Sequence, residues 1–186
     1  MKQNQNVLAL CEGALMVALA LALSYVDINV GFQGGSISLV MIPIIVFSLR
    51  HGALYGIGVG LVFGTLKFFL AGGVALNWQS MLLDYSVAYA AVGLAGLFKN
   101  ANFKLASLVA TVVGVTGRFI VSFISGVTIY AEYAEPVYLG IQTPNAFIYS
   151  IIYNGAYILP SLIIALVAVP VIMEALKRYG IKIIKK

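Results

Sequence analysis

The stretch GALYGIGVGLVFGTLKFFLA, residues 52–71, contains 20 residues, of which only Lys67 is charged. A helix needs about 20 predominantly apolar residues to cross a bilayer, so this stretch predicts a transmembrane helix. Its glycines recur every four residues from Gly52 to Gly64 and therefore share one helix face. Small residues at this spacing let a neighbouring helix approach closely, and we expect this face to pack against another helix rather than to contact a ligand.

The rest of the chain has the same character. Of its 186 residues, 62% are hydrophobic and 9% are charged, and the mean hydropathy is +1.03. Soluble domains carry about 25% charged residues, so a soluble globular protein is excluded. We predict an all-α integral membrane protein, a single domain over residues 1–186 with six transmembrane helices. The predicted spans are residues 7–26, 37–49, 52–71, 80–98, 105–129 and 147–173.

The second of these spans is the shortest. Its residues rise about 20 Å as a helix, which is too little to cross unaided, and Pro43 interrupts it. We expect this span either to be extended by residues 34–38 or to be only partly inserted.

The distribution of charge predicts the orientation. Lys and Arg in short flanking segments stay on the cytoplasmic side. Nine of the eleven basic residues lie at the two ends or in alternate turns, whereas the three remaining turns contain no Lys or Arg, and two of them contain acids. We therefore predict that both termini are cytoplasmic. The basic tail from Lys177 to Lys186 is interpreted as a contact with anionic lipid, and a net charge of +5 does not require nucleic acid as a partner.

Three charged residues lie inside apolar runs: Lys67, Asp84 and Arg118. Charges within the hydrocarbon are costly, so they indicate a functional cavity or a buried pair. All three fall in the outer half of their spans, at the depth of Tyr149 and Asn154. We predict a pocket that opens to the exterior. The alternative is an Asp84–Arg118 pair that only fixes helix packing.

The residue types around this depth suggest the ligand. Arg118, Ser122, Ser125 and Gly126 share one helix face, and Asn154 brings an amide that can donate and accept hydrogen bonds. Aromatic faces attract cations, and Asp84 supplies a matching carboxylate. The expected ligand is therefore small, flat, polar and cationic.

The sequence lacks the residues that several classes of function require. The sequence has no phosphate-binding loop of the Gly-x-x-x-x-Gly-Lys-Ser/Thr type, so ATP-driven transport would need another subunit. Paired carboxylates and a nucleophile beside a base are missing, and Cys11 is the one cysteine. We therefore expect that the protein is not an enzyme and that it binds neither a metal ion nor a cofactor. His51, which follows Arg50 in a predicted cytoplasmic turn, is interpreted as a solvated loop residue.

Four segments together resemble the thiamine-specific substrate-binding (S) component of energy-coupling factor (ECF) transporters, the ThiT/YuaJ thiamine transporter family. They occur in the family's order and extend over most of the chain. The segments are GGSISLVMIPIIVFSLRHG (34–52), LLDYSVAYAAVGLAGLF (82–98), RFIVSFISG (118–126) and IYSIIYNGAYILPS (148–161).

The resemblance implies roles for individual residues. It implies that Asp84 and Tyr85 contact the ligand, and that Tyr149 and Asn154 surround its aminopyrimidine ring. The remaining implied roles concern three positions: Arg118 as the partner of Asp84, Tyr130 stacked on the thiazolium ring, and Gly126 near the hydroxyethyl group.

Further implications concern partners. The family motif Ala-x-x-x-Ala appears as Ala14 and Ala18, where a membrane coupling (T) subunit would dock, although the same motif is equally a general helix-packing face. Two ATPase subunits would use the ATP. The resemblance thus implies a protein of a prokaryotic cell membrane that binds thiamine with high affinity.

One position departs from the family. Ser122 stands where members commonly have His, which leaves open a ligand such as hydroxymethylpyrimidine or another analogue. A proton-coupled carrier acting alone, with Asp84 as the titrating group, and a membrane assembly subunit without a ligand also remain open.

Overall fold

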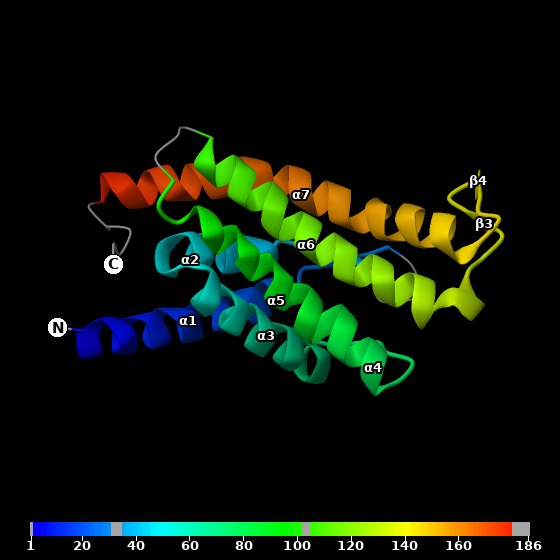
Figure 1. Ribbon diagram of the computed structural model, residues 1–186, viewed down its shortest axis with the longest axis horizontal. Helices are drawn as coiled ribbons and strands as arrows, with labels where there is room; N and C mark the ends of the chain where they lie inside the picture. The colour runs from blue at the N-terminus through cyan, green and yellow to red at the C-terminus, as the bar shows by residue number, and fades with distance from the viewer. Residues whose placement is uncertain (1, 31–34, 102–104, 180–186) are drawn as a thin grey trace.

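The computed structural model describes residues 2–30, 35–101 and 105–179, most of which are helical. Five helical segments are long and apolar enough to cross a membrane. They run side by side along the long axis of the molecule (Figure 1). These segments are Asn6–Ser24, Ala53–Leu70, Trp78–Phe98, Ala106–Thr128 and Ala146–Arg178. They coincide with the first, third, fourth, fifth and sixth predicted spans, with ends that differ by up to five residues, and that they cross a membrane stays a prediction.

Figure 1 labels the elements that make up these segments. The long helices are α1 (Lys2–Ser24), α3 (Ala53–Leu70), α6 (Ala106–Thr128) and α7 (Ala146–Arg178). The fourth span consists of four consecutive helical segments: α4 (Trp78–Met81), the π-helix η1 (Leu82–Val87), α5 (Ala88–Val92) and the 3-10 helix η2 (Gly93–Phe98). The connections contain η3 (Ala131–Tyr133) and two antiparallel hairpins that the all-α prediction lacked: β1 (Ile28–Asn29) with β2 (Ser36–Ile37), and β3 (Val137–Tyr138) with β4 (Ile141–Gln142).

The second predicted span, residues 37–49, is corrected by the structure. Helix α2 (Met41–His51) begins only at Met41, and its 11 residues rise about 16 Å, roughly half of a bilayer's hydrocarbon core. The residues before it are extended: β2 pairs with β1, and the Ser38 N–H donates to Ser161 Oγ over 3.0 Å. Because these partners satisfy the backbone, the segment does not need to continue the helix. The described part of the chain thus has five helices of spanning length, not six.

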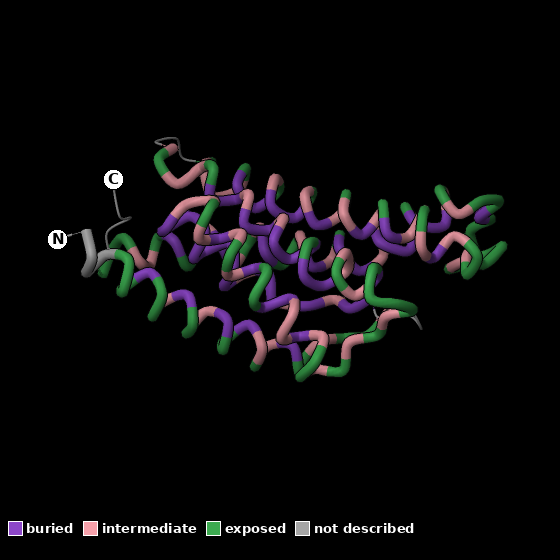
Figure 2. Tube along the Cα trace, turned by 60° about the horizontal axis from the view of Figure 1, so that its bottom comes forward, coloured by how far each residue is buried: buried purple, intermediate pink, exposed green. Residues whose placement is uncertain are grey.

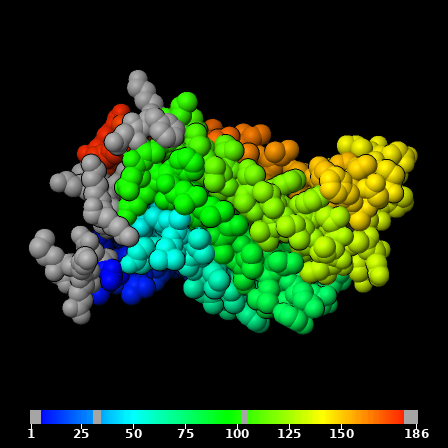
Figure 3. Space-filling model, viewed as in Figure 1, coloured from blue at the N-terminus to red at the C-terminus, as the bar shows by residue number. Residues whose placement is uncertain are grey.

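The two ends of the helical bundle differ. The first turn of α1 and the last turn of α7 lie at the same end (Figure 1). The β3–β4 hairpin lies at the other end and projects beyond the helices there (Figure 3). This arrangement agrees with termini on one side of the membrane, whereas their cytoplasmic location remains a prediction.

Buried residues follow the helix faces that meet inside the bundle, and exposed residues follow the outer faces (Figure 2). The outer faces are apolar: Leu15, Leu54 and Val167 are 69%, 83% and 67% exposed. Apolar surfaces on this scale mark contacts with lipid or with another membrane protein, so the burial pattern agrees with a multi-pass membrane protein.

The glycine face of α3 packs as predicted. A Cβ on Gly60 would lie 2.1 Å from the carbonyl oxygen of Tyr89, and one on Gly64 would lie 2.1 Å from that of Tyr85. Only glycine permits this approach, so the stripe determines how closely α3 lies against η1 and α5.

His51 is not the solvated loop residue that we expected. It is 6% exposed, and its Nε2 lies 2.5 Å from Glu12 Oε2. Glu12 Oε1 also pairs with Arg50 Nη2 over 2.9 Å, and the His51 ring stacks on Phe47. This cluster joins α1 to the end of α2. The sequence did not indicate this cluster, because Glu12 precedes Arg50 by 38 residues and His51 by 39.

Candidate functional site

An inner cavity lies between the fourth span, α6 and α7. Asp84 and Tyr85 line it from the π-helix η1, in which each backbone hydrogen bond spans one residue more than in an α-helix. Such turns occur frequently at functional sites. The cavity is lined by Gly35, Ser36, Lys67, Val74, Asp84, Tyr85, Tyr89, Arg118, Ser122, Gly126, Tyr130, Tyr153, Asn154 and Tyr157. Of the eight residues predicted for the binding site, all but Tyr149 line this cavity: Asp84, Tyr85, Arg118, Ser122, Gly126, Tyr130 and Asn154.

Asp84 is held by a hydroxyl group. Ser125 Oγ donates to Asp84 Oδ2 over 2.9 Å, and Ser125 is fully buried. Ser125 lies on the polar face of α6 that the sequence indicated. Its bond orients one carboxylate oxygen and leaves the other available to a ligand.

Arg118 does not form the predicted ion pair with Asp84, although both residues are described. Its guanidinium carbon lies 4.4 Å from the centre of the Tyr89 ring, a cation–π contact. Arg118 is 5% exposed, and its Nε and Nη1 are buried without a hydrogen-bond partner. Two donors in the cavity wall are thus free for a ligand acceptor.

Asn154 is part of a bonded network on α7. Its Nδ2 donates to the carbonyl oxygen of Ser150 over 2.9 Å and to Ser150 Oγ over 3.1 Å, and its Oδ1 accepts from the Tyr157 hydroxyl over 2.6 Å. A Cβ on Gly126 would lie 2.2 Å from Ser150 Oγ. Gly126 is therefore required for the close approach of α6 to this network.

Tyr149 is the predicted residue that the structure does not bring to the cavity. It is 4% exposed and stacks on Tyr153 with ring centres 5.7 Å apart, and its ring edge contacts Tyr138. Tyr153, one turn further into the bundle, lines the cavity instead. Tyr130 lies in the cavity wall just after the end of α6, where burial raises the pKa of its hydroxyl.

Some lining residues were not assigned from sequence. Tyr89 and Tyr157 lie four residues after Tyr85 and Tyr153, and this spacing on one helix face could have indicated them. Gly35 and Val74 belong to connections, where no periodicity operates. The Gly35 N–H donates to the Tyr153 hydroxyl over 3.0 Å, so the first connection is fastened to α7 at the cavity.

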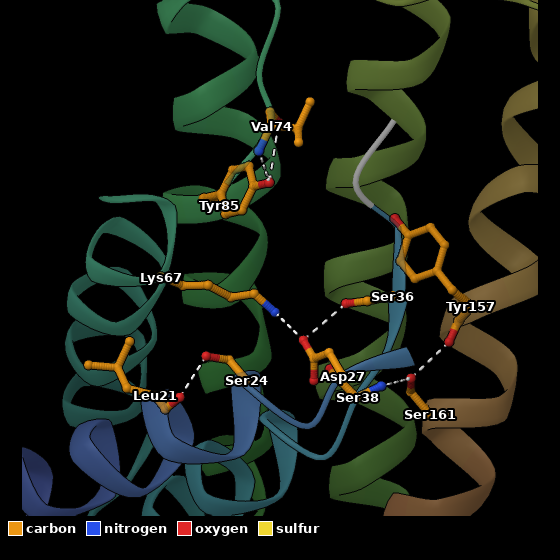
Figure 4. Close-up of polar contacts among 10 residues, drawn as sticks. All are labelled: Leu21, Ser24, Asp27, Ser36, Ser38, Lys67, Val74, Tyr85, Tyr157 and Ser161. Carbon is orange, nitrogen blue, oxygen red and sulfur yellow. Dashed lines mark hydrogen bonds and ion pairs between the residues drawn. The ribbon is translucent and has the colours of Figure 1, made fainter. Parts of the chain in front are cut away.

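An outer cavity adjoins the inner one. It has room for about 350 Å³ of solvent, against about 50 Å³ in the inner cavity. Four residues belong to both walls: Ser36, Lys67, Val74 and Tyr85. The Tyr85 hydroxyl accepts from the Val74 N–H over 2.7 Å and donates to the Val74 carbonyl oxygen over 3.2 Å (Figure 4). Beside it, Lys67 Nζ contacts Asp27 Oδ2 at 2.6 Å.

Ala14 and Ala18, the predicted docking residues, are exposed. They line an apolar groove between α1 and α3 together with Gly58 and Val62. The groove and the two cavities have no lining residue in common.

Comparison with known proteins gives concordant matches. The family described as "Thiamine transporter protein (Thia_YuaJ)" matches residues 10–180. The chain is 36% identical over 179 residues to thiamine transporter ThiT of Bacillus subtilis, covering 88% of this chain and 89% of that protein. It is 29% identical over 188 residues to thiamine transporter ThiT of Lacticaseibacillus paracasei, covering 93% and 90%. The fold matches a solved structure of ThiT from Listeria monocytogenes with a TM-score of 0.80, 23% identity, and coverage of 94% and 97%.

Proposed function

This chain belongs to the thiamine transporter protein (Thia_YuaJ) family, and from that premise we propose that it is the thiamine-binding S component of an ECF transporter. In this role it captures thiamine in the inner cavity with high affinity. A membrane coupling subunit and two ATPase subunits then drive delivery to the cytoplasm. Transport is the function of the curated relatives, and no cofactor of the chain's own is required.

The observation that supports this proposal best is the composition of the inner cavity. Thiamine combines a cationic thiazolium ring with an aminopyrimidine ring. Asp84 offers a carboxylate, and Tyr85, Tyr130 and Tyr153 offer aromatic surfaces that attract cations. Arg118 offers two unpaired donors to ring or hydroxyl acceptors.

The volumes bear on how the ligand is held. The inner cavity, at about 50 Å³, is smaller than a two-ring ligand requires, since pockets for such ligands enclose about 300–1,000 Å³. The adjoining outer cavity supplies the missing space once the wall between them rearranges. We infer that thiamine displaces the Tyr85–Val74 contact when it binds.

Two features support the dependence on partners. The sequence has no phosphate-binding loop, and Ala14 and Ala18 are exposed to a neighbour in the membrane. Thiamine uptake by vesicles that contain this chain alone would contradict the proposal and favour a carrier that acts by itself.

The direct test is calorimetry with purified protein and thiamine. Calorimetry is preferable to the fluorescence of Trp78, which is 67% exposed and lines neither cavity. We expect Asp84→Asn and Asn154→Ala each to weaken binding at least tenfold, about 1.4 kcal/mol. Glu132→Gln, which removes an exposed acid outside both cavities, serves as the control and should bind as the unsubstituted chain does. Unchanged affinity in both site variants would refute the assignment of the site.

A further inference from the structure

The wall between the two cavities contains a buried ion pair. Lys67 lines both cavities, whereas Asp27 lines only the outer one. Lys67 Nζ lies 2.6 Å from Asp27 Oδ2, and Ser36 Oγ donates to the same oxygen over 3.1 Å (Figure 4). The two side chains are 10% and 8% exposed. The other oxygen, Asp27 Oδ1, is buried and has no hydrogen-bond partner.

Without Asp27 the inner cavity would be unfavourable to cations. Its wall holds two cations, Lys67 and Arg118, and one acid, Asp84. The two cations flank the same ring, at 5.7 Å and 4.4 Å from the centre of Tyr89. Charges this deeply buried are weakly screened. Asp27, which contacts Lys67 and lines the outer cavity, balances this excess, and the formal charges of the four residues then sum to zero.

We propose that Asp27 is a specificity-determining residue that makes this transporter prefer organic cations, because it neutralises Lys67 in the wall shared with the inner cavity. This inference rests on the proposed function, because thiamine carries its charge on the thiazolium ring. A purely structural Asp27, which only fastens the first connection to α3, would act on charged and uncharged ligands alike.

The experiment compares thiamine with 3-deazathiamine, in which an uncharged thiophene replaces the thiazolium ring. Calorimetry gives both dissociation constants for the unsubstituted chain, Asp27→Asn and the double variant Asp27→Asn/Lys67→Met. The readout is the preference, the dissociation constant of 3-deazathiamine divided by that of thiamine. Incomplete folding of a variant cancels in this ratio.

We expect the preference to fall at least tenfold in Asp27→Asn, where Lys67 is left unpaired, and to return to within threefold of the original in the double variant. Glu132→Gln, an exposed acid outside both cavities, should leave it unchanged. An unchanged preference in Asp27→Asn, or no recovery in the double variant, would overturn the inference. The proposed function fails separately, through absence of thiamine binding by the unsubstituted chain.

Discussion

Replacing Gly64 by alanine tests whether the glycine face of α3 positions the binding site. The new Cβ would lie 2.1 Å from the carbonyl oxygen of Tyr85 and 2.6 Å from its carbonyl carbon. Atoms in folded proteins do not approach so closely, so α3 and η1 must separate by about 1 Å. Overpacking of this kind costs about 1–3 kcal/mol. Since η1 carries Asp84 and Tyr85 into the cavity, we also expect thiamine affinity to fall at least tenfold.

Gly58→Ala is the matched control. It lies on the same helix, but a Cβ there has no atom within 4 Å. Both substitutions gain the higher helix propensity of alanine, about 1 kcal/mol, so this gain cancels when the two variants are compared. The difference in unfolding free energy should therefore be about 1–3 kcal/mol. Thermal unfolding in one detergent measures it, at about 2–4 °C per kcal/mol for a chain of this size. Equal stability and equal affinity of the two variants would refute the reasoning.

Two further predictions concern single contacts. Ser125→Ala removes the hydroxyl that donates to Asp84, so thiamine affinity measured by calorimetry should fall threefold or more. Thr128→Ala, which removes an exposed hydroxyl of the same helix, is the control and should leave the affinity unchanged. An unchanged affinity in Ser125→Ala would show that this bond does not orient the carboxylate. Glu12→Gln leaves Arg50 and His51 poorly paired and should lower the free energy of unfolding by about 1–3 kcal/mol. This loss is smaller than that from breaking a fully buried ion pair, because the Glu12 side chain is 23% exposed. Glu174→Gln, in an exposed pair, is its control in thermal unfolding, and equal melting of the two variants would argue against a stabilising cluster.

The sequence was sufficient for features that depend on local pattern. Apolar runs located five spanning helices, since length and hydropathy decide insertion. Helix periodicity placed Arg118, Ser122 and Gly126 on one face, and the cost of charge in lipid indicated Asp84. All four line one cavity.

Contacts that depend on how the loops between helices fold could not be predicted from the sequence. Lys67 was identified as functionally informative, but its partner Asp27 is 40 residues away, and the β1–β2 hairpin decides which acid it meets. The same applies to Glu12 and His51. Tyr149 and Tyr153 share a helix face and both pack against Tyr138, so periodicity alone does not tell which of them lines the cavity.

The π-helix shows why packing and binding cannot be separated at this site. A wider turn shifts the residues that follow it around the helix axis, which rotates Tyr89 relative to an uninterrupted α-helix. No residue of Leu82–Val87 is a glycine or proline, so the sequence of the turn itself does not indicate the distortion. Two glycines of α3 lie against this region: Gly64 meets the carbonyl of Tyr85 in η1, and Gly60 meets that of Tyr89 in α5. The stripe that was predicted only to pack therefore also supports the backbone that carries Asp84, Tyr85 and the ring beneath Arg118. Substitutions in this stripe should consequently alter ligand affinity although none of its glycines lines the cavity.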